Sequence, residues 1–120
     1  MRDGIPLTVP VFTFVDVRDV ALAHVRAMTV PEAAGKRFYV VSGFFANSWI
    51  STLVRRRFPQ LEDKLPPPEE DAKDDFPDEH WEFDNSRSRE VLGLEYIGLE
   101  QCLVDTVESI LAFKGVGGGE

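Results

Sequence analysis

The clearest pattern of hydrophobic and polar positions runs through residues 12–28, FTFVDVRDVALAHVRAM. Bulky and β-branched side chains at 12–15 predict a short strand. Asp16 then stands where a helix N-cap belongs, and Asp19 falls in the first turn, where both carboxylates would meet free N–H groups and the positive end of the helix dipole. The helix that follows has one predicted apolar face, because its apolar residues recur every three or four positions. The residues of that face are Val17, Val20, Ala21, His24, Ala27 and Met28.

Two further elements are predicted in the middle of the chain. Phe38–Ser42 is a continuous apolar run, which is typical of a strand covered on both faces in a parallel sheet. Asn47 or Ser48 can cap a helix that runs to about Phe58. The three arginines at 55–57 complement the negative end of that helix, and a phosphate contact is the alternative interpretation.

A short helix is predicted close to the C-terminus. Asp84, Asn85 and Ser86 are three consecutive cap candidates, and we expect the helix to end at Leu92. Gly93 then occupies the C′ position, which favours glycine because the backbone turns left-handed there.

The pattern divides the chain into three parts. Residues 1–10 contain two prolines and predict an irregular lead-in, and residues 115–120 predict a flexible tail. The body spans 11–114, with a final helix over 99–114. Within it, we expect residues 59–80 to form a mobile acidic loop without regular structure.

The net charge of −8 is concentrated in one segment. Residues 69–84 contain nine acids and one base, so the remainder of the chain is balanced. Such a chain repels nucleic acid and anionic membranes, and neither is an expected partner. The acidic segment is interpreted as a solvated loop, or alternatively as a docking surface for a basic partner.

The chain has few residues suited to metal or disulfide chemistry. Cys102 is the only cysteine, so no internal disulfide forms, and with His24 and His80 as the only histidines no Cys/His zinc site is expected. Cys102 is expected to pack rather than to act as a nucleophile, and His24 to be a hydrogen-bonded core histidine. No apolar run approaches the roughly 20 residues of a membrane span. With no signal-peptide core at the N-terminus, we expect a cytoplasmic protein.

Two segments carry a family resemblance. The first segment is FVDVRDVALAH at 14–24. The second is residues 83–111, with an Asp84-Asn85-Ser86 start, a Leu-Gly helix end and a Thr106-Val107 pair. Both resemble the C-terminal part of extended short-chain dehydrogenases/reductases, of the NAD-dependent epimerase/dehydratase superfamily. Fungal NADPH-dependent carbonyl and methylglyoxal reductases, with their dihydroflavonol reductase-like relatives, are the most similar members. The resemblance spans residues 11–113. It implies an α/β fold: the C-terminal portion of an extended Rossmann-type enzyme, with two or three short strands and about four helices, lacking the N-terminal nucleotide-binding core.

Members of this family bind NADP(H) and reduce a carbonyl by hydride transfer, but their signature motifs are absent from this sequence. The glycines at 115–119 have no strand before them and no helix after them, so they do not form the glycine-rich turn that holds a pyrophosphate. The catalytic Tyr-x-x-x-Lys is also missing, because Tyr39 is followed four positions later by Gly43, and Tyr96 by Glu100. No catalytic, cofactor-binding or metal residue is therefore assigned, and no cofactor is expected on this chain alone.

The resemblance does suggest a substrate pocket. Ser42, Gly43, Phe44 and Phe45 follow the predicted strand, at the sheet edge where ligands bind in open α/β folds. Phe44 and Phe45 would line an apolar pocket, or alternatively be ordinary packing residues.

Two functions remain open at this point. The first is the substrate-binding portion of an NADPH-dependent reductase of small carbonyl compounds, without turnover alone. The second is a non-catalytic interaction module that complements a separate Rossmann segment or self-associates, because a truncated sheet leaves unpaired strand edges.

Overall fold

The computed structural model describes residues 8, 11–72 and 74–116. Apart from Thr8, the predicted lead-in over 1–10 lies outside the described residues, as do residues 117–120 of the predicted tail.

The chain forms two compact units. Of the described residues, the first unit comprises residues 8, 11–12, 45–72, 74–76 and 99–116, and the second unit comprises residues 13–44 and 77–98. Each unit has a hydrophobic cluster of its own.

The second unit begins with the predicted strand and helix. Strand β1, Thr13–Phe14, pairs antiparallel with β2, Gly43–Phe44, so that Thr13 lies opposite Phe44 and Phe14 opposite Gly43. Helix α1 spans Val17–Thr29, and the Oδ1 atom of Asp16 accepts a hydrogen bond from the backbone N–H of Arg18 at 2.8 Å. The predicted acidic cap is thus confirmed for Asp16.

The buried face of α1 differs from the predicted one. Asp19 and Ala23 are its buried residues, whereas Val17 and Met28 of the predicted apolar face are 76% and 78% exposed. Ala23 packs with Ala33, which lies in the 3₁₀ helix η1 (Pro31–Ala33), and with Leu92 and Leu94. The prediction failed because spacing identifies an apolar face but not whether anything covers it.

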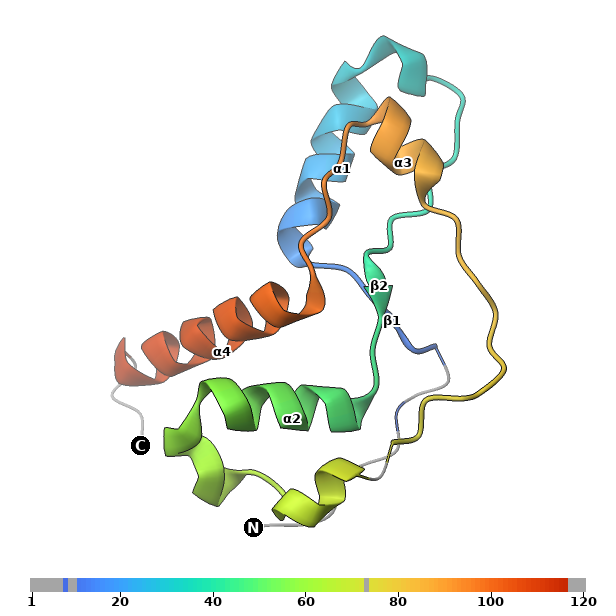
Figure 1. Ribbon diagram of the computed structural model, residues 1–120. Coiled ribbons are helices and arrows are strands. Elements are labelled where there is room, and N and C mark those ends of the chain that lie inside the picture. Colours follow the sequence, from blue (N-terminus) through green and yellow to red (C-terminus); the bar gives the residue numbers. More distant parts are fainter. Residues whose placement is uncertain (1–7, 9–10, 73, 117–120) are drawn as a thin grey trace. The chain divides into compact units, whose positions relative to one another are not determined.

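The predicted strand at Phe38–Ser42 is also wrong for this chain, since no described residue pairs with it along a ladder. Its segment instead runs beside helix α3, Ser86–Val91 (Figure 1). Three alternate carbonyl groups of the segment accept hydrogen bonds from side chains at the start of α3. They are Arg37 O from Arg87 Nη1 at 3.3 Å, Tyr39 O from Ser88 Oγ at 3.1 Å, and Val41 O from Asn85 Nδ2 at 2.7 Å. Side chains therefore take the place of a neighbouring strand on this edge.

The ends of α3 match the prediction only in part. Asn85 occupies the N-cap position and makes no side-chain cap bond, and Ser86 is the first helical residue rather than a cap. Asp84, one position before the N-cap residue, supplies the capping bond instead: its Oδ1 accepts a hydrogen bond from the Ser86 N–H at 2.9 Å. Gly93 follows the helix with a φ of +67°, which confirms the predicted C′ glycine.

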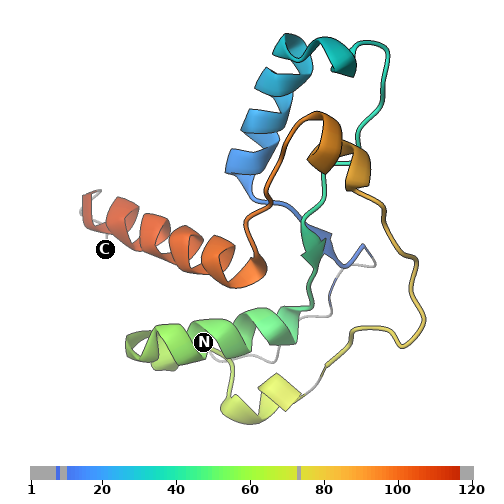
Figure 2. The same cartoon turned by 45° about the horizontal axis from the view of Figure 1, so that its top comes forward.

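The first unit is built on two long helices. Helix α2, Asn47–Arg57, and helix α4, Leu99–Val116, lie side by side (Figure 1 and Figure 2). Their cluster buries Val54, Phe58 and Val104. Neither Asn47 nor Ser48 caps α2, because Ala46 holds the N-cap position and the Asn47 N–H donates to Thr8 Oγ1 at 2.8 Å. Since α4 includes residues 115 and 116, the predicted tail does not begin at 115.

The acidic loop predicted over 59–80, called the acidic segment from here on, contains regular structure, contrary to the prediction. It forms two 3₁₀ helices, η2 at Pro59–Lys64 and η3 at Pro68–Ala72. Thr8 anchors its later part, because Asp75 accepts hydrogen bonds from the Thr8 N–H at 2.6 Å and from the Thr8 hydroxyl at 2.9 Å. None of the helices in the described part of the chain combines the length and apolar character that a membrane span requires.

Candidate functional site

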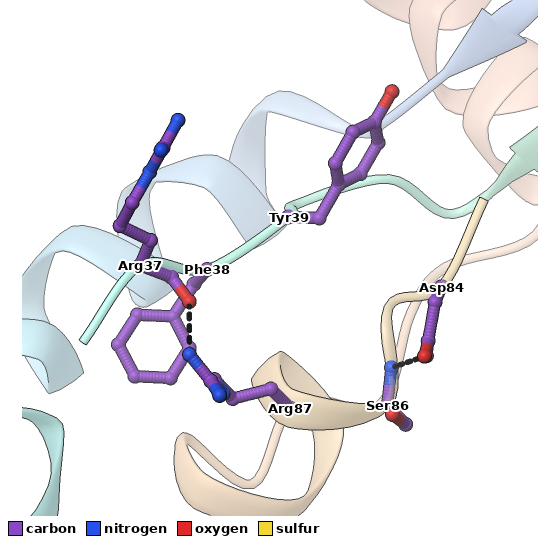
Figure 3. A pocket seen from close by; sticks show the side chains of 6 residues that line it. All are labelled: Arg37, Phe38, Tyr39, Asp84, Ser86 and Arg87. Carbon is purple, nitrogen blue, oxygen red and sulfur yellow. Dashed lines mark hydrogen bonds between the residues drawn. The ribbon is translucent and has the colours of Figure 1, made fainter.

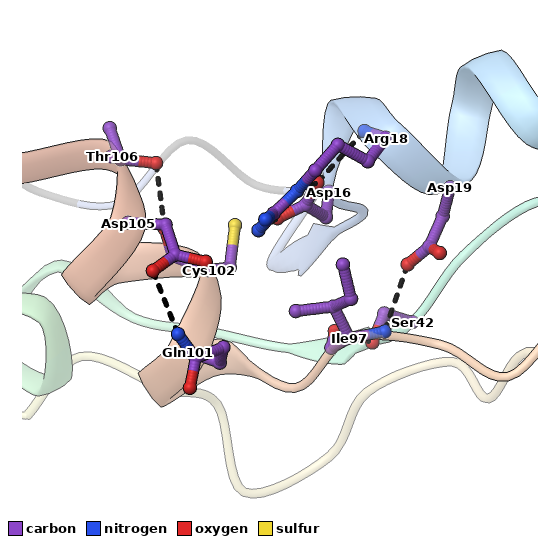
Figure 4. A network of polar contacts seen from close by, with 9 residues as sticks. All are labelled: Asp16, Arg18, Asp19, Ser42, Ile97, Gln101, Cys102, Asp105 and Thr106. Atoms are coloured by element: carbon purple, nitrogen blue, oxygen red, sulfur yellow. Dashed lines mark hydrogen bonds and ion pairs between the residues drawn. The ribbon is translucent and has the colours of Figure 1, made fainter. Parts of the chain in front are cut away.

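Ser42, the first residue of the predicted pocket, makes hydrogen bonds to the backbone of two distant segments of the second unit. Its N–H donates to the Phe14 carbonyl at 2.9 Å, and its hydroxyl donates to the Ile97 carbonyl at 2.8 Å. The Ile97 N–H in turn donates to Asp19 Oδ2 at 2.8 Å (Figure 4). Asp19 therefore accepts a hydrogen bond from the backbone of Ile97 rather than capping its own helix. The Ser42 hydroxyl fixes the same residue through its carbonyl, so Ser42 has a structural role.

Gly43 and Phe44 form β2 and lead into an aromatic cluster. The Phe44 ring lies 4.8 Å from the His80 ring, 5.1 Å from the Phe83 ring and 6.5 Å from the Trp81 ring, measured between centroids. His80 Nδ1 lies 3.8 Å from a carboxylate oxygen of Glu82. The same nitrogen lies 3.1 Å from the Trp81 carbonyl, and the Trp81 side chain is 46% exposed. Sequence reasoning assigned only Phe44 to the cluster, because residues 80–83 lie almost 40 positions further along the chain.

Phe45 belongs to the first unit, so the four predicted pocket residues are divided between the units. Its N–H donates to the carbonyl of Phe12 at 2.8 Å. Phe12 has a φ of 59°, a strained conformation for a bulky side chain. Its ring packs edge-on against Phe76 at 5.5 Å, and Phe76 stacks on Trp49 at 5.0 Å. No sequence pattern pointed to Phe12, since backbone strain leaves no periodic signal.

The tyrosines do not form an acid–base pair. Tyr96 exchanges a hydrogen bond with Ser88 Oγ at 2.8 Å, and Tyr39 is 47% exposed with no lysine four positions on. Gly115, the first glycine of the C-terminal run, lies in the last turn of α4 and not in a strand-to-helix turn. Among the described residues, no group of three or more His, Cys, Asp or Glu side chains could hold a metal ion.

The other candidate residues have structural explanations. His24 is exposed, and its Nδ1 lies 2.8 Å from the Val20 carbonyl of the same helix, so the predicted core position is wrong. Cys102 is a half-buried thiol in α4, where its carbonyl accepts the Thr106 hydroxyl at 2.7 Å (Figure 4).

The arginine triplet of α2 is paired with acids of its own unit. Arg56 and Arg57 both pair with Glu100, and the hydrogen bond from Arg57 lowers the pKa of that carboxyl. Arg55 pairs with Asp71 at 2.9 Å and with Glu62 at 2.7 Å. The triplet therefore stabilises the end of α2, and the phosphate alternative finds no support.

The second unit also has a groove that the sequence did not suggest. It has a volume of about 420 Å³ between the 37–39 segment and the start of α3 (Figure 3). Its lining residues are Arg37, Phe38, Tyr39, Asp84, Ser86 and Arg87, which together we call the guanidinium groove.

Comparison with known proteins identifies the family. No family model matches the chain. The chain is 47% identical over 108 residues to the ketoreductase azaE of Aspergillus niger. This match covers 90% of this chain and 31% of that protein.

Two solved structures agree with this match. Gre2 from Candida albicans in complex with NADPH has a TM-score of 0.76 at 35% identity, covering 92% of this chain and 32% of that one. Yeast methylglyoxal/isovaleraldehyde reductase Gre2 complexed with NADPH has a TM-score of 0.77 at 29% identity, covering 94% of this chain and 36% of that one.

The fold is therefore the C-terminal α/β part of a short-chain dehydrogenase. The chain belongs to the extended short-chain dehydrogenase/reductase family, and its relatives include the fungal ketoreductase and two fungal proteins named as NADPH-dependent methylglyoxal reductases. It spans about a third of the length of the relatives it matches. The predicted family and fold class are confirmed.

Proposed function

We propose that this chain is the C-terminal, substrate-binding portion of an NADPH-dependent reductase of small aldehydes and ketones, and that it has no turnover alone. The relatives named as methylglyoxal reductases supply the substrate class. A cytoplasmic location belongs to the same proposal. The cofactor and the catalytic tyrosine and lysine would reside in the part of the relatives that this chain does not span.

An unpaired backbone edge of the Phe38–Ser42 segment, which forms no strand in the described chain, supports the proposal. Ser42 shares one edge of its segment with Phe38 and Val40, since successive residues of an extended chain direct their N–H and C=O groups to alternate edges. Ser42 uses this edge to bond Phe14, whereas the backbone groups of Phe38 and Val40 have no partner among the described residues. Such an edge is suited to a neighbouring strand of a larger sheet.

The exposed face of α1 supports the same reading. Val17 and Met28 are more than three-quarters exposed although they share one helix face with other apolar residues. Apolar spacing of this kind usually reflects burial against another element. The face would thus be covered in a longer protein.

The aromatic cluster is the surface best suited to a substrate. Phe44 and Trp81 present aromatic rings against which a small carbonyl compound can pack. We assign these residues to binding and not to proton transfer.

The proposal is tested by titrating the purified chain with NADPH while following nicotinamide fluorescence, and then adding methylglyoxal. We expect no saturable binding and no NADPH oxidation. The full-length yeast NADPH-dependent methylglyoxal reductase is the positive control. Turnover by the chain alone would overturn the claim that it is only part of the catalytic unit.

The open edge also supports a second candidate function, that of a module which complements a separately encoded Rossmann segment. The test mixes the chain with the N-terminal segment of the ketoreductase and measures complex formation by light scattering. Met28→Glu places a charge on the exposed face of α1 and is expected to abolish the complex. Thr29→Glu adds the same charge on a different face of the same helix and is expected to leave it intact. Equal effects of the two variants would contradict docking through this face.

A further inference from the structure

We propose that the guanidinium groove binds a small organic oxyanion, a phosphate monoester or carboxylate attached to a planar ring. The site shares no residue with the aromatic cluster and does not depend on the proposed reductase function. Its evidence is the charge, the open donors and the ring faces that line it.

The two arginines of the groove have no ion pair with a described residue, unlike most other arginines in the described part of the chain. The guanidinium of Arg37 has no hydrogen bond or ion pair with a described residue, and Arg87 donates a single bond, to the Arg37 carbonyl at 3.3 Å. A planar guanidinium matches the two oxygens of a carboxylate or phosphate, so these unused donors are suited to an oxyanion. Four other arginines are ion-paired with acids. They are Arg18, Arg55, Arg56 and Arg57.

The groove also provides space and aromatic surface. Its volume of about 420 Å³ is within the usual range for a small-molecule site. Arg37 and Tyr39 leave one side of the segment and Phe38 leaves the other (Figure 3). Tyr39 is 47% exposed, and its hydroxyl has no partner among the described residues. A ring attached to the oxyanion can therefore stack on Tyr39 while the charge reaches an arginine.

Asp84 limits which anions fit. Hydrogen bonds from Ser86 lower the pKa of the Asp84 carboxyl, so it is charged at neutral pH. Two arginines and one carboxylate leave the groove with one net positive charge. The arrangement favours a ligand with one oxyanion group and a hydroxyl or amino donor near Asp84, and it disfavours polyanions.

The test is an NMR titration of the labelled chain with 4-hydroxybenzoate and with phenyl phosphate, which distinguishes the carboxylate from the phosphate source. Benzyl alcohol, which has the ring without the charge, and inorganic phosphate, which has the charge without the ring, are the matched controls. We expect saturable shifts of the Arg37 and Arg87 Nε–H signals and of the Tyr39 ring with at least one ring-bearing anion. Inorganic phosphate is expected to bind more weakly without shifting the ring.

Variants identify the residues responsible. Arg87→Gln is expected to weaken binding about tenfold, the loss of one charge-assisted contact. Arg89→Gln removes the same charge from α3 at a residue that does not line the groove, where Arg89 Nε donates to Asn85 Oδ1 at 2.9 Å, and is expected to change the affinity less than Arg87→Gln does. Arg87→Lys keeps the charge but not the two-pronged geometry, and should give an intermediate affinity.

The inference is overturned by absence of saturable shifts, by equal weakening in the Arg87 and Arg89 variants, or by shifts that spread over all arginines. Backbone spectra of each variant that superimpose on the parent outside α3 establish that a loss of affinity does not reflect unfolding. Should Arg87→Gln fail this check, Arg37→Gln and the ligand controls on the parent chain decide the question.

Discussion

Replacing Asp71 by asparagine removes the charge that ties the acidic segment to helix α2. The carboxylate accepts hydrogen bonds from Arg55 Nε at 2.9 Å, Arg55 Nη2 at 3.2 Å and Ser51 Oγ at 2.7 Å. The Arg55 side chain also donates to Glu62 at 2.7 Å and to the Pro66 carbonyl at 2.8 Å. Arg55 thus joins three points of the segment, and Asp71 is its strongest partner.

The size of the effect follows from the exposure of the pair. The side chains of Arg55 and Asp71 are 17% and 18% exposed, between a buried and a surface ion pair. Hydrogen bonds to charged groups contribute roughly 1.5–3 kcal/mol, and exposed ion pairs up to about 1 kcal/mol. Asn retains one acceptor oxygen, so we expect Asp71→Asn to cost about 1–2 kcal/mol.

The pH dependence has a definite sign. Hydrogen bonding to Arg55 lowers the pKa of Asp71, and burial only partly offsets this. A carboxyl with a lowered folded pKa stabilises the protein above its unfolded value of about 4, and this contribution is lost as the pH falls further. The parent and the Asp71→Asn variant should therefore differ at neutral pH and converge as the pH falls from about 4 through the lowered folded pKa of Asp71.

Trp49 is a built-in reporter for this experiment. It stacks on Phe76 at 5.0 Å, and its Nε1 donates to Asp74 Oδ2 at 3.1 Å, so its fluorescence follows docking of the segment. Urea unfolding is measured in a Trp81→Phe background, with Asp63→Asn as the control that removes one charge from an exposed position of η2. Equal midpoints for the Asp71 and Asp63 variants at neutral pH would refute the reasoning.

Three further changes test other parts of the structure. Gly93→Ala forces a side chain into a left-handed position and should cost about 1–2 kcal/mol in urea unfolding, whereas Gly98→Ala, with open space around the added carbon, should cost little. Asp19→Ala leaves the Ile97 N–H without its partner and should destabilise by about 1–3 kcal/mol, with faster hydrogen exchange at that amide. Glu100→Gln alters only the two exposed ion pairs with Arg56 and Arg57, and its thermal midpoint should stay close to that of the parent; a clear drop would contradict this.

Local rules predicted the parts of the fold that depend on neighbouring residues. Asp16 caps α1 because its side chain needs only the N–H two positions on, and Gly93 follows α3 because only glycine turns left-handed without strain. The order of the helices was visible in the spacing for the same reason. The family resemblance supplied the fold class, which local pattern alone does not determine.

Contacts between distant residues were not predictable in this way. Asp19 looked like a second cap, but it bonds Ile97, 78 positions further on. Phe38–Ser42 has the apolar content of a parallel strand, yet its carbonyls bond side chains of α3 because the described chain offers no parallel neighbour.

In the candidate site, too, contacts between residues far apart in the sequence could not be predicted. Phe44 was expected to line a pocket, and its ring does pack against other aromatic residues, but His80 and Trp81 could not be assigned to that cluster from their positions in the chain. Whether these residues contact a substrate remains a prediction of the proposed function. Spacing gave no hint of the guanidinium groove, because its arginines lie 50 positions apart.

The most direct test of the proposed function is a chimera in which this chain replaces the matching C-terminal part of the Aspergillus niger ketoreductase. NADPH oxidation is followed with a panel of aldehydes and ketones, beside the isolated chain and the isolated N-terminal segment. We predict turnover by the chimera and none by either part alone. Turnover by the isolated chain, or a folded chimera that binds NADPH without reducing any carbonyl compound, would contradict the account.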